Sequence, residues 1–156
     1  MTSAPSLADS WHQHTLRGNT EFQLACYDDA LRLHRSALEH AIEDFPVRVN
    51  FCVDHAIARV LISHFSMADC HRALADYERA AQNYIDAQRF LLRCERELDD
   101  TPRTRNAIAH ANLHLQQLWC EFVKAHEGAI PDVCRCAYRD GDTQLARQAG
   151  VGSVLH

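Results

Sequence analysis

The sequence contains little glycine and proline, a single lysine and no long apolar run. Its 156 residues include only five Gly and four Pro, which favours long helices over a β sandwich with many tight turns. The basic residues are almost all Arg, since Lys124 is the single Lys, and the formal net charge is −5. This balance lacks the basic surface of a nucleic-acid-binding protein. The longest apolar stretch, around Val60 to Ile62, is far too short to cross a bilayer, so we expect neither a nucleic-acid ligand nor a membrane span.

Sequence signals for export and for catalysis are missing as well. Residues 1–14, MTSAPSLADSWHQH, contain no apolar h-region, so we expect no signal peptide. The chain has seven Cys, an odd number, and the first five fall within helical patterns, where a thiol behaves as a small hydrophobe. There is no G-x-S-x-G, no phosphate-binding Gly-rich loop and no dinucleotide fingerprint. We therefore expect a cytoplasmic protein that is not an enzyme and needs no cofactor.

Apolar residues recur at helical spacing through most of the chain, and five stretches each have an apolar face. Asp44-Phe45-Pro46 predicts a break followed by a Pro-started helix that runs to Leu74. This third helix has apolar residues on several sides, so we expect it to pack between neighbours. Asp76 is expected to cap the fourth helix, and Thr101 followed by Pro102 is expected to begin the fifth.

The pattern predicts one all-α domain, an antiparallel helix-turn-helix stack of about five helices. A chain of 156 residues fits one domain, and folding at this size buries roughly 70% of the unfolded surface without help from a disulfide or a metal. Gly128 is expected to end the fifth helix. We place the helical domain at residues 1–128 and a loosely ordered C-terminal tail at residues 129–156, in which Asp142 to Ala149 could make one short helix.

Two segments share the pattern Tyr-x-x-Ala-x-x-x-aromatic-x-x-Ala, with His in the aromatic position of the first. The members are Tyr27, Ala30, His34 and Ala37, and then Tyr77, Ala80, Tyr84 and Ala87. The pattern resembles the second helix of a tetratricopeptide repeat (TPR), in which small alanines let two helices approach closely. Gly18 and Phe22 precede the first copy, and Ala68 precedes the second, as small or aromatic contact positions. The copies lie fifty residues apart (Ala30 to Ala80) instead of the 34 of the family, and we expect the long third helix to absorb the difference.

The resemblance implies a protein that binds another protein. TPR proteins hold a peptide or a helix in a concave groove lined by the first helix of each hairpin. Carried over to this chain, the groove is lined by Gln13, Leu16, Thr20, Gln23, Ile62, Phe65, Asp69 and Arg72. Ile62 and Phe65 favour an apolar or amphipathic segment as the ligand. The alternative is that Ile62 and Phe65 belong to the core.

Two short motifs point instead to a metal-binding or redox-responsive protein. Cys134-Arg-Cys136 places two thiols one residue apart, which can bind a soft metal or form a strained disulfide. Structural zinc sites need a second ligand pair, and the sequence has no second Cys pair of this kind. His110 and His114 lie one helical turn apart, a spacing that can chelate zinc or nickel, but their strip lies opposite the apolar stripe of the same helix, where polar residues facing solvent are expected.

Two further alternatives concern the arrangement of the helices. The same helices could form an ordinary bundle in which the repeated Ala and Tyr only pack a core. A stack of only two hairpins could also close by forming a homodimer. The sequence thus predicts an all-α, TPR-like fold and favours a role in protein binding, with metal binding as the alternative.

Overall fold

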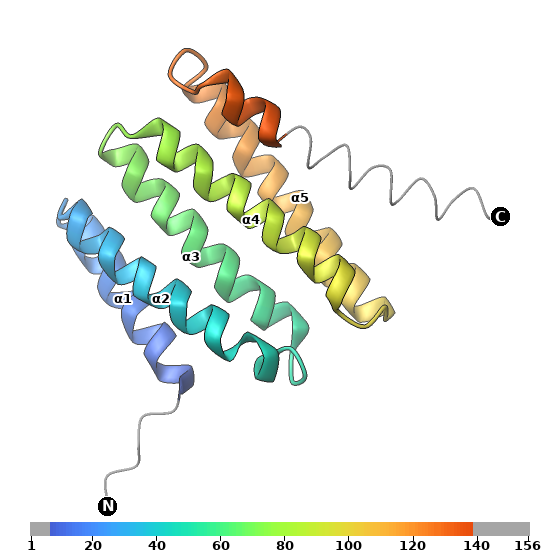
Figure 1. Ribbon diagram of the computed structural model, residues 1–156. Coiled ribbons are helices and arrows are strands. Elements are labelled where there is room, and N and C mark those ends of the chain that lie inside the picture. The colour runs from blue at the N-terminus through green and yellow to red at the C-terminus, as the bar shows by residue number, and fades with distance from the viewer. Residues whose placement is uncertain (1–6, 139–156) are drawn as a thin grey trace, which may run out of the picture.

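The computed structural model describes residues 7–138 and contains five long helices and one short one (Figure 1). The long helices are α1 (Leu7–Gln23), α2 (Tyr27–Arg48), α3 (Val53–Ala73), α4 (Tyr77–Glu97) and α5 (Pro102–Ala125). A short helix follows at residues 132–138. No strand occurs within residues 7–138, so the predicted all-α helical stack is confirmed.

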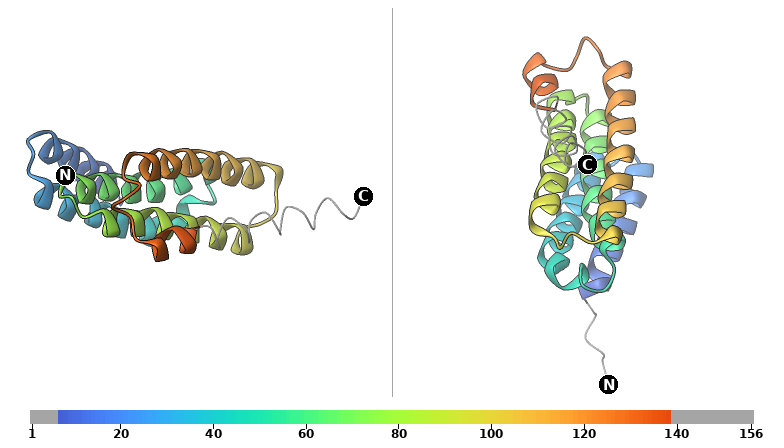
Figure 2. Two further views of the ribbon diagram at one scale, coloured as in Figure 1. Left: turned by 90° about the horizontal axis from the view of Figure 1, so that it is seen from above. Right: turned by 90° about the vertical axis from the view of Figure 1, so that its right-hand side faces the viewer.

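The long helices are arranged as antiparallel neighbours around α3. Helices α1 and α2 form one hairpin and α3 and α4 the next, and α3 contacts each of the other four long helices. In Figure 1, α2 and α4 lie toward the viewer with α3 between them. The side view in Figure 2 shows α5 on the face opposite α4. The expectation that the third helix packs between neighbours agrees with this arrangement.

The turns of the two hairpins repeat each other fifty residues apart. Ala25 and Ala75 have positive φ angles of 61° and 58°, in the left-handed region that costs a residue with a side chain about 1–2 kcal/mol. Each turn closes with the same backbone hydrogen bonds, from Cys26 N to Glu21 O at 2.9 Å and from Asp76 N to His71 O at 2.8 Å. The same chain reversal is therefore built twice, and in the second copy the Asp76 carboxylate also caps α4 by accepting from Arg79 N at 3.2 Å.

The repeated small residues lie buried where helices pack against each other. Ala30, Ala37, Ala80 and Ala87 are all fully buried. Gly18 of α1 lies against the imidazole of His34, and a Cβ at position 18 would stand 2.7 Å from two atoms of that ring. The ring of His34 is itself only 2% exposed. The pattern that was read from the sequence therefore marks real helix–helix contacts.

The helix boundary predicted at Pro46 is wrong. Helix α2 continues through Pro46 to Arg48, and α3 begins at Val53. A proline in the last turn removes only one backbone hydrogen bond, and Asn50 Nδ2 donates to the Pro46 carbonyl at 3.1 Å to close the helix end. Asp44 lies within α2 and marks no break, because it is buried and its carboxylate pairs with Arg48 at 2.5 Å. The long third helix therefore does not exist, and the fifty-residue spacing comes from four helices of 17, 22, 21 and 21 residues.

A polar cluster joins α1, α2 and α3. The Asp44 carboxylate, 7% exposed, also lies 3.4 Å from the Arg59 guanidinium of α3. That guanidinium stacks over Trp11 of α1, at 4.8 Å from the ring centroid. The Trp11 indole N–H in turn donates to Ser63 Oγ at 3.0 Å. One buried carboxylate thus organises contacts that hold the first hairpin on the second.

The helical unit extends past its predicted end at Gly128. Ile130, Cys134 and Tyr138 are buried and belong to the core. The Tyr138 ring stacks on Trp119 of α5 with a centroid distance of 4.4 Å. The helix at residues 132–138 lies beside α5 as α4 lies beside α3 (Figure 2), so the packed unit continues through residue 138. The short helix that was expected at Asp142–Ala149 lies outside the described residues.

Candidate functional site

The residues predicted to line a groove lie on exposed or half-exposed positions of α1 and α3. On α1, Leu16 is 52% exposed, and its predicted companions Gln13, Thr20 and Gln23 are exposed as well. On α3, Ile62 is 41% exposed, Phe65 and Asp69 are half-buried and Arg72 is exposed. Ile62 is therefore not a core residue, whereas Phe65 packs partly against the core.

A crevice lies between α3 and α5 and brings together residues that the sequence analysis treated separately. Its volume is about 280 Å³, and its walls include Ile62 and Phe65 of α3 together with His110 and His114 of α5. The remaining lining residues are Asp54, Ala58, Leu61, Ala107 and Ala111. The crevice has an apolar floor and imidazole groups at its rim, the kind of surface that can receive an apolar side chain while polar groups bond to its neighbours.

Aromatic contacts fix the wall of this crevice. The Phe65 ring meets the His114 imidazole edge to face at a centroid distance of 5.5 Å and the Tyr84 ring at 6.1 Å. Tyr84 in turn contacts Phe122 at 5.1 Å, and burial raises the pKa of its phenol to about 12. The repeat tyrosine of α4 and His114 of α5 thus both contact the Phe65 ring, which helps to hold this wall of the crevice in place.

The predicted polar residues of α3 form an ion pair at the other end of the same face. Arg72 Nη2 donates to Asp69 Oδ1 at 3.0 Å, and both side chains are nearly half exposed. Burial raises the pKa of the Asp69 carboxyl, and the Arg72 guanidinium opposes this rise. A pair as exposed as this adds little stability, so both groups can exchange partners with a ligand.

The cysteine and histidine motifs do not meet in one cluster. Cys134 and Cys136 lie on the helix at residues 132–138, where the first is buried and the second exposed, because positions two apart on a helix point to different sides. Burial raises the pKa of the Cys134 thiol, which disfavours the reactive thiolate. His110 and His114 are both exposed. Within the described part of the chain, no group of three or more His, Cys, Asp or Glu could hold a metal ion.

Small side chains open the crevice, a role that could not be read from their helical spacing alone. Ala58 on α3 and the pair Ala107 and Ala111 on α5 leave room between the two helices. The one-turn spacing of Ala107 and Ala111 makes a shallow strip on α5, but the crevice also depends on the packing of α5 against α3. Leu113, exposed on α5, was overlooked.

Comparison with known proteins gives a family but no described relative. No curated protein and no solved structure matches the chain. Within the described residues, no helix is both long and apolar enough to cross a membrane. The model of one family, "Protein of unknown function (DUF2753)", matches residues 9–147, which include α2 to α5 in full and α1 from its third residue. The chain therefore belongs to the DUF2753 family of proteins of unknown function.

Proposed function

We propose that this protein is a non-catalytic, TPR-like protein-binding module. It holds a peptide or an amphipathic helix of a partner along the face formed by α1, α3 and α5, as an adaptor or a chaperone does. The observation that carries the proposal is the crevice between α3 and α5, in which Ile62 is 41% exposed beside Phe65 and His114. An apolar side chain of the partner is expected to enter there.

Two exposed apolar side chains lie on this face. Leu16 on α1 and Ile62 on α3 are large apolar residues whose exposure to water contributes nothing to folding. A partner that covers such a side chain removes apolar surface from water, which favours binding. Both residues are among those carried over from the TPR groove, which the first helix of each hairpin lines.

The repeated packing supports the TPR-like relationship. In the first hairpin Gly18 lies twelve positions before Ala30, and in the second Ala68 lies twelve positions before Ala80. The three alanines are buried. The pair Cys134 and Tyr138 has the same four-residue spacing as Ala80 and Tyr84, which is consistent with a third hairpin whose first helix is α5 and whose second helix begins at residue 132. Repeat proteins of this kind bind partners on the face that the first helices share.

The state of the cysteines supports an intracellular location. All seven are free thiols, and proteins of oxidising compartments generally pair theirs. We therefore propose that the module works in the cytoplasm, where a reducing environment keeps Cys26, Cys120 and Cys136 unpaired although they are exposed.

Site-specific photo-crosslinking in the native cells tests the proposal. A photoreactive phenylalanine analogue replaces Ile62 in the crevice or Leu16 on α1, and, as controls, Val47 or Val133. All four are exposed apolar positions, but the controls lie at the end of α2 and on the helix at residues 132–138. We expect positions 62 and 16 to give a discrete adduct with the same protein, and positions 47 and 133 not to give that adduct.

The masses of the adducts, and the positions that give them, distinguish a complex with another protein from a homodimer and from non-specific crosslinking. An adduct of twice the mass of the chain would indicate a homodimer across this face. Equal adducts from all four positions, or none from position 62 in a protein that is folded and expressed, would contradict the proposal. Mass spectrometry of the adduct names the partner, whose segment can then be synthesised for a direct binding measurement.

A further inference from the structure

A second groove lies on the opposite face of the molecule, between α2 and α4. The backbones of α2 and α4 are not in contact with each other, and α3 lies behind the gap between them (Figure 1). Two cavities follow each other along this gap, with volumes of about 560 and 140 Å³. Ile42 of α2 and Arg93 of α4 line both cavities, so the two are parts of one continuous groove.

One end of the groove is mostly apolar. The smaller cavity is lined by Phe45 and Pro46 of α2 and by Phe90, Cys94 and Leu98 on the α4 side, with the charged groups of Arg93 and Glu97 beside them. The rings of Phe45 and Phe90 meet edge to face at a centroid distance of 5.3 Å and form its floor. Ile42, at the junction of the two cavities, is 51% exposed. An apolar side chain placed here would be sheltered on both sides.

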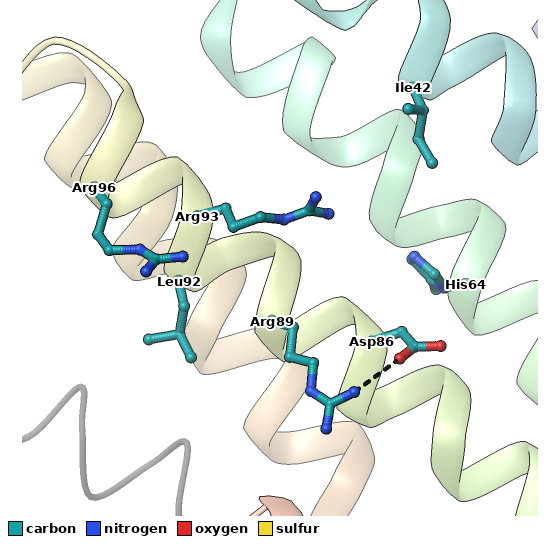
Figure 3. A pocket seen from close by; sticks show the side chains of 7 residues that line it. All are labelled: Ile42, His64, Asp86, Arg89, Leu92, Arg93 and Arg96. Carbon is teal, nitrogen blue, oxygen red and sulfur yellow. Dashed lines mark ion pairs between the residues drawn. The ribbon is translucent and has the colours of Figure 1, made fainter.

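The other end is rich in guanidinium groups. Arg89, Arg93 and Arg96 line the larger cavity at positions one helical turn apart on α4. Arg89 pairs with Asp86 at 3.8 Å. Within residues 7–138, Arg93 and Arg96 have no carboxylate within 4.0 Å. Figure 3 shows Arg93 reaching across the gap toward Ile42 and His64. Its charge is therefore available to a ligand in the groove.

A buried histidine faces the same cavity from α3. His64 lines the larger cavity, is only 8% exposed, and its Nδ1 atom has no hydrogen-bond partner among the described residues. Burial lowers the pKa of this imidazole, and the nearby Arg93 lowers it further, whereas Asp86 and a hydrogen bond with Asn83 raise it. An imidazole that lines the cavity can form a hydrogen bond with a polar group in the groove.

We propose that the groove between α2 and α4 binds an acidic amphipathic segment of a partner protein. An apolar side chain of the segment lies on the Phe45–Phe90 pair, and a carboxylate of the segment one turn away bonds to Arg93. Guanidinium–carboxylate bonds are charge-assisted and directional, so they set the orientation of the segment, while the apolar end supplies contact area. This site is separate from the face of α1, α3 and α5 and does not depend on the function proposed for that face.

The charge of the whole molecule selects a short acidic segment over a long polyanion. The net charge of −5 repels an extended nucleic acid, whose binding needs a broad basic surface. The local excess of guanidinium groups spans only about two turns of α4, from Arg89 to Arg96. A peptide with one or two carboxylates beside an apolar residue matches both ends of the groove.

Selection from a random 12-residue peptide library on the immobilised full chain tests the proposal. The unmodified protein is compared with three variants, Arg93→Glu, Ile62→Asp and Arg79→Glu. Arg93 lies in the groove, Ile62 lies on the other face, and Arg79 is an exposed arginine of α4 outside the groove. We expect a class of peptides with Asp or Glu beside Leu, Ile or Phe that is lost with Arg93→Glu alone.

Affinity measurements on one enriched peptide complete the test. Fluorescence anisotropy should show about tenfold weaker binding when its acidic residue is replaced by the amide, or when the protein carries Arg93→Glu. A peptide class that survives Arg93→Glu, enrichment without acidic residues, or no enrichment on the folded protein would overturn the proposal. A class lost with Ile62→Asp instead would belong to the other face, so the two sites are tested independently.

Discussion

Replacing Gly18 by alanine tests the close contact between α1 and α2. In the structure a Cβ at this position would stand 2.7 Å from Cε1 and Nε2 of His34 and 3.0 Å from Cδ2. Ordinary contact begins at 3.4 Å, so the ring or the helix must move by about 0.7 Å (3.4 − 2.7). The ring has no free space to enter, because His34 is 2% exposed.

Two opposing effects determine how far Gly18→Ala changes the free energy of unfolding. Alanine is favoured over glycine inside a helix by about 1 kcal/mol, whereas overpacking a buried contact costs about 1–3 kcal/mol. We therefore expect Gly18→Ala to lower the free energy of unfolding by up to about 2 kcal/mol. In a His34→Ala background the ring is gone, so the same change should raise the free energy of unfolding by about 1 kcal/mol. The difference between the two backgrounds isolates the contact.

Urea denaturation followed by circular dichroism at 222 nm measures all four proteins of this cycle. Folded proteins have free energies of unfolding of roughly 5–15 kcal/mol, so we expect the single and double variants to remain folded. Gly128→Ala is the matched control, because nothing lies within 4 Å of a Cβ at that position. A coupling below about 0.5 kcal/mol between positions 18 and 34, the usual limit for independent sites, would refute the proposed contact.

Three further predictions concern buried side chains. Asp44→Asn should lower the free energy of unfolding by about 2 kcal/mol in urea, less than for a fully buried pair because the Arg48 and Arg59 side chains reach solvent. Tyr138→Ala should cost about 3 kcal/mol, because the ring is buried on Trp119; an unchanged midpoint would mean that residues 132–138 do not pack on α5. Burial lowers the pKa of four histidines, so below about pH 6.5 the unfolded chain binds more protons than the folded protein. The melting temperature should therefore fall as the pH drops below about 6.5. The four histidines are His14, His34, His64 and His71.

The helices could be predicted from the sequence, but one boundary could not. Apolar periodicity and the caps at Asp76 and Thr101 are local signals, and both side chains accept the expected backbone bonds. The turn at residues 49–52 carries no glycine or proline, and its N-cap, Cys52, makes no side-chain bond. Asp44 and Pro46 supplied a misleading signal there, because the burial of Asp44 between two arginines depends on a contact with α3 that no local pattern reveals.

The sequence pointed to two residues of the crevice but not to its arrangement. The resemblance to the TPR groove named Ile62 and Phe65 among eight residues, and these two line the crevice. The sequence alone did not pair them with His110 and His114, which were read as a strip facing solvent. That pairing depends on the packing of α5 against α3, which follows from the way the whole stack closes. The arginines of α4 were passed over because charged residues at helical spacing are ordinary on an exposed surface.

The central claim is that the face of α1, α3 and α5 binds another protein through the crevice at Ile62. Titration of the partner identified by crosslinking, with calorimetry as the readout, tests this directly. Because burying an isoleucine contributes about 1.5–3 kcal/mol, Ile62→Asp should weaken the affinity at least tenfold, while Val47→Asp, an exposed position outside the crevice, should leave it within about twofold. Equal affinities of the two variants, with unchanged helicity, would contradict the account.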